Sequence, residues 1–333
     1  MGKFMLNHGG AISKAALKYN IPVSKWLDLS TGINLNGYPV NNIPVTAWLK
    51  LPDCDHELIQ AAKLYYNTEF LLSCNGSQSV IQLLPRLRNL SKIGLVFPSY
   101  NEHEYAWSKH KHQINYIDPD NILQAAYDND VVIICNPNNP SGRFYPVNEL
   151  LECRNLLMAK NGWLIVDEAF IDADKEANSL TGLTDKKGLI VLRSIGKFFG
   201  LAGARVGFVV AEPTFLALIQ NELGPWSVTG PSQYIVTKAL LDTKWQNENI
   251  LDLKQRSQRL KKTLQLCNLS ITGSTNYFHW IINDKAYLIQ NILANQAIWV
   301  RLFDNPLSIR IGIPALESDW DKLQEALKKI STI

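Results

Sequence analysis

The sequence has few of the features of secreted, membrane-spanning or zinc-binding proteins. It has only five cysteines among 333 residues, and no two of them form a Cys-x-x-Cys pair. Their odd number and scattered positions support neither a disulfide framework nor a zinc site. No apolar run approaches the roughly 20 residues of a membrane helix. The first ten residues contain no long apolar core, so we expect no signal peptide and a cytoplasmic location.

Charge is also sparse. Charged residues make up 19% of the chain and the net charge is only +3, which is too small to argue for nucleic-acid binding. The slight basic excess suits an anionic substrate. Apolar content is 46%, and a chain of this length can bury a large core. These values favour a metabolic enzyme without a metal, nucleic-acid or membrane partner.

The pattern along the chain is typical of an α/β protein. From about residue 52 to 210, helical patterns alternate with short apolar strands, which predicts a mostly parallel sheet covered on both faces. We expect three parts: an N-terminal arm (1–45), a large domain (46–230), and a linking helix with a small C-terminal α/β domain (231–333).

The last third of the chain carries more detailed expectations. A helical pattern runs from Pro231 to Leu266, with a soft break near Asn247. A strand is expected near 297–303. The last helix is expected over 319–330, with Asp319 or Ser318 as its N-cap.

One lysine stands in an unusual setting. Lys197 completes a Ser-x-x-Lys step that begins at Ser194, just after the apolar strand 189–192, and Arg205 follows in a glycine-rich turn. A lysine amine can form an imine with an aldehyde, while a hydroxyl and an arginine fork suit a phosphate. The combination predicts pyridoxal phosphate held as a Schiff base on Lys197. The simpler alternative is a strand, a polar turn and a surface lysine.

Such a site needs an acid at the pyridine nitrogen and a donor to the phenolic oxygen. Asp167 closes the apolar run 163–166, and the carboxyl ends of strands are where open α/β sheets place their ligands. Asn139 follows the strand 131–135, and its amide can donate without adding charge. Taken alone, Asp167 could be a helix N-cap, and Asn139 could belong to an ordinary turn.

The site also needs a second phosphate anchor and a ring partner. Gly76-Ser77-Gln78 opens a helical pattern after an apolar segment, where free amide groups favour an anion. Tyr100 follows the strand 93–97 and can stack on the cofactor ring. A simple capped helix and an unremarkable tyrosine are the alternatives.

Taken in order, these motifs resemble fold-type-I pyridoxal phosphate enzymes, which include the aspartate aminotransferase superfamily. The order is Gly-Ser, Pro-x-Tyr, Asn-x-Asn-Asn-Pro-x-Gly, Asp-Glu-Ala-Phe, Ser-x-x-Lys, then Arg. Within that superfamily the chain is similar to the threonine-phosphate decarboxylases of cobalamin biosynthesis. His8-Gly9-Gly10 and Gly224-Pro225-Trp226 narrow the resemblance to that group, and it extends over nearly the whole chain.

The resemblance implies a fold and a role for each matching position. The fold has a large domain with a central sheet and a smaller C-terminal α/β domain. Lys197 and Asp167 would be catalytic. The further cofactor contacts would be Gly76, Ser77, Gln78, Tyr100, Asn139, Ser194 and Arg205. The substrate contacts would be Arg310, Arg301, His8, Thr31, Gly32 and Asn139.

The implied reaction is the decarboxylation of L-threonine O-3-phosphate to (R)-1-amino-2-propanol O-2-phosphate, carried out by a homodimer. Two alternatives stay open. One is an aminotransferase for a phosphorylated substrate such as histidinol phosphate, and the other is a pyridoxal-binding regulator or partner protein without turnover.

The chain departs from many relatives at two positions. Phe170 stands where a tyrosine often donates to the phenolic oxygen, and this favours the decarboxylase over a transaminase. Leu51 stands where a tyrosine often reaches the cofactor phosphate of the partner subunit.

Overall fold

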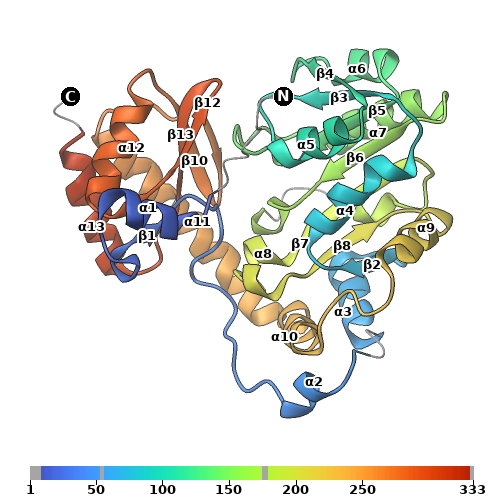
Figure 1. Cartoon of the computed structure of the whole chain (residues 1–333), viewed down its shortest axis with the longest axis horizontal. Coiled ribbons are helices and arrows are strands. Elements are labelled where there is room, and N and C mark those ends of the chain that lie inside the picture. The colour runs from blue at the N-terminus through green and yellow to red at the C-terminus, as the bar shows by residue number, and fades with distance from the viewer. Residues whose placement is uncertain (1–8, 53–55, 175–178, 331–333) are drawn as a thin grey trace. The chain divides into compact units, whose positions relative to one another are not determined.

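The computed structural model describes residues 9–52, 56–174 and 179–330 (Figure 1). The chain divides into two compact units. The larger unit comprises 37–139 and 144–248, and the smaller comprises 1–36, 140–143 and 249–333. The three parts expected from the sequence (1–45, 46–230 and 231–333) divide the chain differently, and that division stays a prediction.

The larger unit is built on a seven-stranded sheet with the order β2-β8-β7-β6-β5-β3-β4. Strand β8 runs antiparallel to both of its neighbours, and the other neighbouring pairs are parallel. The strands are β2 (Leu71–Cys74), β3 (Lys92–Val96), β4 (Gln113–Ile117), β5 (Val131–Cys135), β6 (Trp163–Asp167), β7 (Leu189–Ser194) and β8 (Gly207–Val210). The expected mostly parallel α/β sheet is confirmed.

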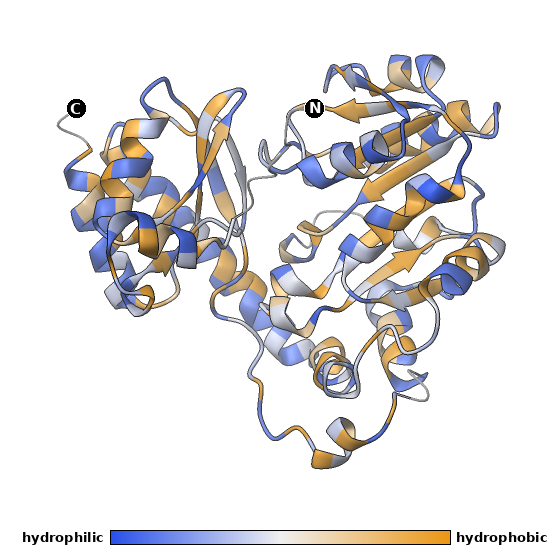
Figure 2. Cartoon of the chain, viewed as in Figure 1, coloured by the Kyte–Doolittle hydropathy of each residue, from blue (hydrophilic) through white to orange (hydrophobic). Residues whose placement is uncertain are grey.

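Helices cover both faces of this sheet. All five residues of β5 are buried although successive side chains point to opposite faces, so neither face meets solvent there. Figure 2 shows the hydrophobic character of these central strands. The helices of the unit are α2 (Val45–Leu49), α3 (His56–Tyr66), α4 (Ser77–Leu83), α5 (Asn101–Lys109), α6 (Ile122–Asp128), α7 (Val147–Met158), α8 (Ile195–Phe198), α9 (Pro213–Leu223) and α10 (Gly230–Leu241).

The smaller unit has an antiparallel sheet with the order β12-β13-β10-β9 and a parallel pair, β1 and β11. Its core contains Trp320, Leu260 and aliphatic residues of β13. Its elements are α1 (Ile12–Tyr19), β1 (Leu27–Asp28), β9 (Gly273–Thr275), β10 (Phe278–Ile282), α12 (Ala286–Asn295), β11 (Ile298–Trp299), β12 (Arg301–Asp304), β13 (Leu307–Gly312) and α13 (Glu317–Lys328).

The predicted break in the long helical pattern is wrong by five residues. The chain interrupts its helix at Asp242, between α10 and α11 (Thr243–Leu266), and not at Asn247. The Asp242 carboxylate accepts a hydrogen bond from the amide of Trp245, with 3.0 Å between Oδ1 and N. This side chain therefore satisfies a free amide at the start of α11, which makes a new helix start there favourable.

Two predictions near the C-terminus are also corrected. The strand expected over 297–303 is two short strands, because β11 pairs with β1 whereas β12 pairs with β13. The last helix begins at Glu317, before the predicted caps, and the Asp319 carboxylate accepts from the Leu316 amide within its first turn. None of the described helices is long and apolar enough to cross a bilayer.

Candidate active site

The ends of several strands deliver the predicted site residues to one edge of the large sheet. Strands β5, β6 and β7 are parallel, so their carboxyl ends lie at the same edge. Asn139 follows β5, Asp167 ends β6, and Ser194 ends β7 just before Lys197 on α8. The carboxyl edge of a parallel sheet is where the strand dipoles, helix starts and loops together form ligand sites.

These residues line one pocket of about 120 Å³ within the larger unit. Its lining includes all nine residues that the sequence predicts to contact the cofactor: Gly76, Ser77, Gln78, Tyr100, Asn139, Asp167, Ser194, Lys197 and Arg205. Cys135, Ala169 and Phe170 complete it. Lys197 and Asp167 therefore belong to the same cavity, as the pyridoxal hypothesis requires.

Asp167 is held by a histidine that the sequence reasoning missed. Asp167 is buried, and its Oδ2 lies 3.0 Å from His103 Nε2. Its other oxygen accepts from the amide of Ala169 at 3.1 Å. His103 lies on α5, three residues after Tyr100 and one helical turn along, and only its spacing from Tyr100 could have pointed to it.

His103 is expected to be a cation in this setting. Burial lowers the pKa of His103, but its hydrogen bonds to Asp167 and Cys135 outweigh that effect and raise the pKa to about 10. His103, Cys135 and Asp167 also bring three possible metal-ligand atoms within 4.8 Å of one another. The His103–Asp167 ion pair already uses two of these groups, so the geometry favours a positioned carboxylate over a metal centre.

Another group of lining residues can hold a phosphate. Ser77 begins α4, whose first turn has free amide donors. The backbones of Gly207 and Ser77 approach closely, because a Cβ on Gly207 would lie 2.4 Å from the Ser77 nitrogen. The Arg205 side chain lies against Gly76, where a Cβ would lie 2.6 Å from Arg205 Nη2. Arg205 adopts a left-handed backbone conformation at φ 53°. This concave cradle, with an arginine fork and two serine hydroxyls nearby, fits a phosphate dianion.

The amine and two aromatic side chains also line this pocket. Lys197 Nζ lies 5.2 Å from the centre of the Phe170 ring. The Ser194 hydroxyl accepts from the Gly196 amide at 3.3 Å and caps the short helix that carries Lys197. The Tyr100 hydroxyl donates to Gln78 Oε1 at 3.1 Å. With an acid, an amine, aromatic side chains and a phosphate cradle in one pocket, the residues fit pyridoxal phosphate.

The other predicted substrate contacts belong to the smaller unit. Arg310 is buried on β13, donates to the Ser30 carbonyl oxygen at 2.6 Å, and has its guanidinium 4.6 Å from the Phe278 ring centre. Arg301 on β12 is its direct cross-strand partner.

The remaining predicted contacts lie near the N-terminus. Thr31 and Gly32 follow β1 in a turn, where Thr31 Oγ1 accepts from the Ile33 amide at 3.4 Å and Gly32 has a φ of 63°. His8 lies outside the described residues.

Comparison with known sequences gives a consistent result. The family profile for class I and II aminotransferases matches residues 46–330. A threonine-phosphate decarboxylase of Pseudomonas aeruginosa is 41% identical over 97% of both chains. One from a Sinorhizobium species is 37% identical over 97% of this chain and 98% of its own. A histidinol-phosphate aminotransferase of Shewanella amazonensis is 28% identical over 90% of this chain and 88% of its own.

Solved structures agree on the fold. A histidinol-phosphate aminotransferase of Sinorhizobium meliloti, in complex with pyridoxal-5'-phosphate, superposes with a TM-score of 0.80 and 20% identity, covering 100% of this chain and 98% of that one. An L-threonine-O-3-phosphate decarboxylase of Porphyromonas gingivalis superposes with a TM-score of 0.79 and 18% identity, covering 92% and 99%.

Proposed function

Because the chain belongs to the class I and II aminotransferase family, we propose that it decarboxylates L-threonine O-3-phosphate with pyridoxal phosphate as cofactor. The product is (R)-1-amino-2-propanol O-2-phosphate, and the step serves cobalamin biosynthesis. The observation that carries this function is the near-full-length similarity to two threonine-phosphate decarboxylases.

The residues of the pocket divide the binding of the cofactor among them. When bound, pyridoxal phosphate supplies an aldehyde that condenses with amines and a protonated ring that accepts an electron pair. In this proposal Asp167 holds the ring nitrogen, Asn139 donates to the phenolic oxygen, Tyr100 covers the ring, and Lys197 holds the aldehyde carbon. Phosphate contacts come from Gly76, Ser77, Gln78, Ser194 and Arg205.

Substrate orientation decides which bond breaks. The residues that hold the substrate would therefore select between decarboxylation and amino transfer. Arg310 recognises the substrate carboxylate as a bidentate pair, and Arg301 is assigned to the substrate phosphate with His8, Thr31 and Gly32. Arg301 and Arg310 are direct cross-strand partners on β12 and β13, so the two roles are assigned to neighbouring positions of one sheet. Lys197 would also be the group that returns a proton to the α-carbon.

Two measurements separate this function from its runner-up, a histidinol-phosphate aminotransferase, which the 28% identical relative favours. The holoenzyme is expected to release carbon dioxide from L-threonine O-3-phosphate without an added keto acid. Stoichiometric amino transfer from histidinol phosphate to 2-oxoglutarate, with no carbon dioxide release, would establish the aminotransferase instead.

Replacing Arg310 with lysine tests carboxylate recognition. Lysine keeps the charge but loses the planar fork, so one charge-assisted hydrogen bond of about 1.5–3 kcal/mol is lost. We expect kcat/KM to fall about 10- to 150-fold, measured by carbon dioxide release over a range of substrate concentrations.

Arg259→Lys is the matched control, because Arg259 lies in the same unit and forms an exposed ion pair with Glu317. Its kcat/KM should stay within about twofold of the parent, as surface pairs contribute little. An unchanged kcat/KM for Arg310→Lys would remove Arg310 from the carboxylate site.

A homodimer is the second part of this proposal. Helix α2 exposes Val45, Trp48 and Leu49 together, and Leu51 follows close behind. Trp48 is 66% exposed and Leu49 78% exposed, which is unusual for neighbouring large apolar side chains on a monomer. We assign this surface to contact with a second copy of the chain.

The double variant Trp48→Glu, Leu49→Glu is expected to shift the protein from dimer to monomer, because charges in an apolar interface must be desolvated. Sedimentation velocity at micromolar concentration measures the shift. Leu90→Glu, at another exposed leucine of the same unit, should leave the dimer intact. A variant at α2 that sediments like the parent would place the interface elsewhere or show that the parent is monomeric.

A cytoplasmic location completes the proposal. Four of the five cysteines lie among the described residues, and each is a free thiol. Free thiols are typical of a reducing compartment.

A further inference from the structure

A buried ionic network is formed by residues that are sequence neighbours of pocket residues. Their side chains lie on the other face of the strands. Glu168 follows Asp167, and Arg193 precedes Ser194. Neither lines the pocket, and both are buried. Successive residues of a strand point to opposite faces, so one residue of each pair faces the cofactor site and its neighbour faces the network.

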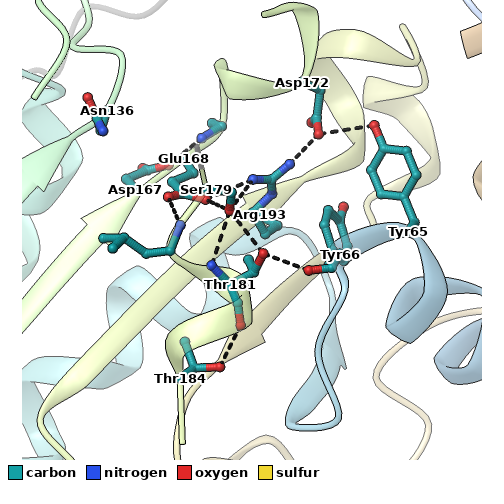
Figure 3. A network of polar contacts seen from close by, with 12 residues as sticks. Tyr65, Tyr66, Asn136, Asp167, Glu168, Asp172, Ser179, Thr181, Thr184 and Arg193 are labelled. Atoms are coloured by element: carbon teal, nitrogen blue, oxygen red, sulfur yellow. Dashed lines mark hydrogen bonds and ion pairs between the residues drawn. The ribbon is translucent and has the colours of Figure 1, made fainter. Parts of the chain in front are cut away.

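Arg193 is the centre of this network, as Figure 3 shows. Its Nη1 donates to Glu168 Oε2 at 2.8 Å and to the Ser179 hydroxyl at 3.2 Å. Its Nη2 donates to Asp172 Oδ1. The guanidinium also lies 4.6 Å from the ring centre of Tyr66. The Arg193 side chain therefore connects β7 to Glu168 and Asp172, which follow β6 in the chain.

Both carboxylates have further donors. Glu168 accepts from the Leu180 amide at 2.9 Å and from the Ser179 hydroxyl, and Asp172 accepts from the Tyr65 hydroxyl at 3.1 Å. Burial raises the pKa of both acids, against the lowering effect of Arg193. Two acids and one guanidinium leave a surplus negative charge when all are ionised, so the network depends on Arg193.

Stability alone is a poor explanation for such a network. The desolvation of buried ions offsets most of their attraction, and apolar residues of similar volume often stabilise a core as well or better. Ionic networks do, however, impose fixed distances, because a planar guanidinium accepts only a narrow range of partner geometries. The network fixes Glu168, Asp172 and Arg193, and each of them lies next to or close to a pocket residue in the chain.

We propose that Arg193 is a positioning residue that sets the distance between the two ends of the cofactor site. Through Glu168 it holds Asp167 at the ring-nitrogen end, and through its own strand it holds Ser194 at the phosphate end. Asp172 extends the same restraint to Phe170, two residues earlier in the chain. The backbone supports this coupling, since the Glu168 amide donates to the Leu192 carbonyl oxygen at 2.9 Å. The proposal rests on pyridoxal phosphate as the cofactor.

The experiment compares two variants of the network with one stability control. Arg193→Lys keeps the charge but cannot reach both acids with one nitrogen, and Ser179→Ala is a mild change that removes only the bridging hydroxyl. Leu150→Ala, at a fully buried position of α7 away from the pocket, destabilises the core without touching the network. For each apoprotein, added pyridoxal phosphate is titrated by visible absorbance, the pH midpoint of the bound band is recorded, and urea unfolding measures stability.

We expect Arg193→Lys to raise the Kd for pyridoxal phosphate about tenfold or more and to shift the pH midpoint of its absorbance band. Loss of a residue that orients a metal ligand weakens metal binding by a similar factor. Ser179→Ala should change both the Kd and the pH midpoint in the same direction and by less. Leu150→Ala should keep the parent Kd and pH midpoint despite its lower urea midpoint.

Parent values of Kd and pH midpoint in a folded Arg193→Lys would make the network merely structural and overturn the proposal. If Arg193→Lys does not fold, Ser179→Ala decides in the same way. Failure of the parent protein to bind pyridoxal phosphate would instead refute the proposed cofactor, so the two failures are distinguishable.

Discussion

Lys197→Ala is expected to lose both the visible absorbance of the bound cofactor and measurable turnover. No other side chain predicted for the site is an amine that could join the cofactor aldehyde. Proton transfer by a positioned group alone contributes about 10²–10⁴-fold, and the covalent role adds to that. We therefore expect carbon dioxide release to fall by at least about 10⁴-fold, measured after reconstitution with pyridoxal phosphate.

Lys187→Ala is the matched control, because Lys187 is exposed and its side chain lies outside the pocket. It should keep the parent absorbance and rate. A Lys197→Ala protein that stays yellow and active would show that another amine carries the cofactor, and the assignment of Lys197 would be wrong.

Asp167→Asn is expected to lower the turnover number about 100- to 1,000-fold. The amide keeps the shape of the side chain but cannot carry the charge that stabilises a protonated ring, and it leaves buried His103 without its carboxylate. Loss of one preorganised electrostatic partner of the reacting group costs about 2.7–4 kcal/mol in the transition state. Rates of carbon dioxide release at saturating substrate and cofactor measure the effect.

A second measurement on this variant separates ring chemistry from cofactor loss. Visible absorbance should still report bound cofactor at high concentration, because Lys197 and the phosphate cradle are unchanged. Asp128→Asn, at an exposed position of α6, should behave as the parent. Parent-like turnover of Asp167→Asn would exclude Asp167 as the partner of the ring nitrogen.

The pocket could be predicted from the sequence because its residues follow a local rule. Apolar runs such as 131–135 and 163–166 predicted buried strands, and polar residues at their carboxyl ends were assigned to one sheet edge. The structure brings those residues into one cavity. Their individual roles toward the cofactor and substrate stay predictions, as do the homodimer and the domain boundaries.

The histidine and arginine behind the pocket could not be predicted in that way. His103 is one of six histidines, and nothing local distinguishes it until α5 places it against β6. No local pattern assigns a partner to Arg193, since Glu168 and Asp172 come more than 20 residues earlier. The proximity of Arg193 to these two acids depends on the register between β6 and β7.

The order of residues along this chain determined which chemical groups are available at the sheet edge, because strand ends and glycine turns are encoded by neighbouring residues. Only the tertiary structure decided which charged groups lie close enough to interact. The Asp167–His103 pair, the Arg193 network and the facing arginines 301 and 310 all arise where segments distant in sequence lie side by side. Electrostatic energy depends on distances through space, and those distances are set by strand order and register.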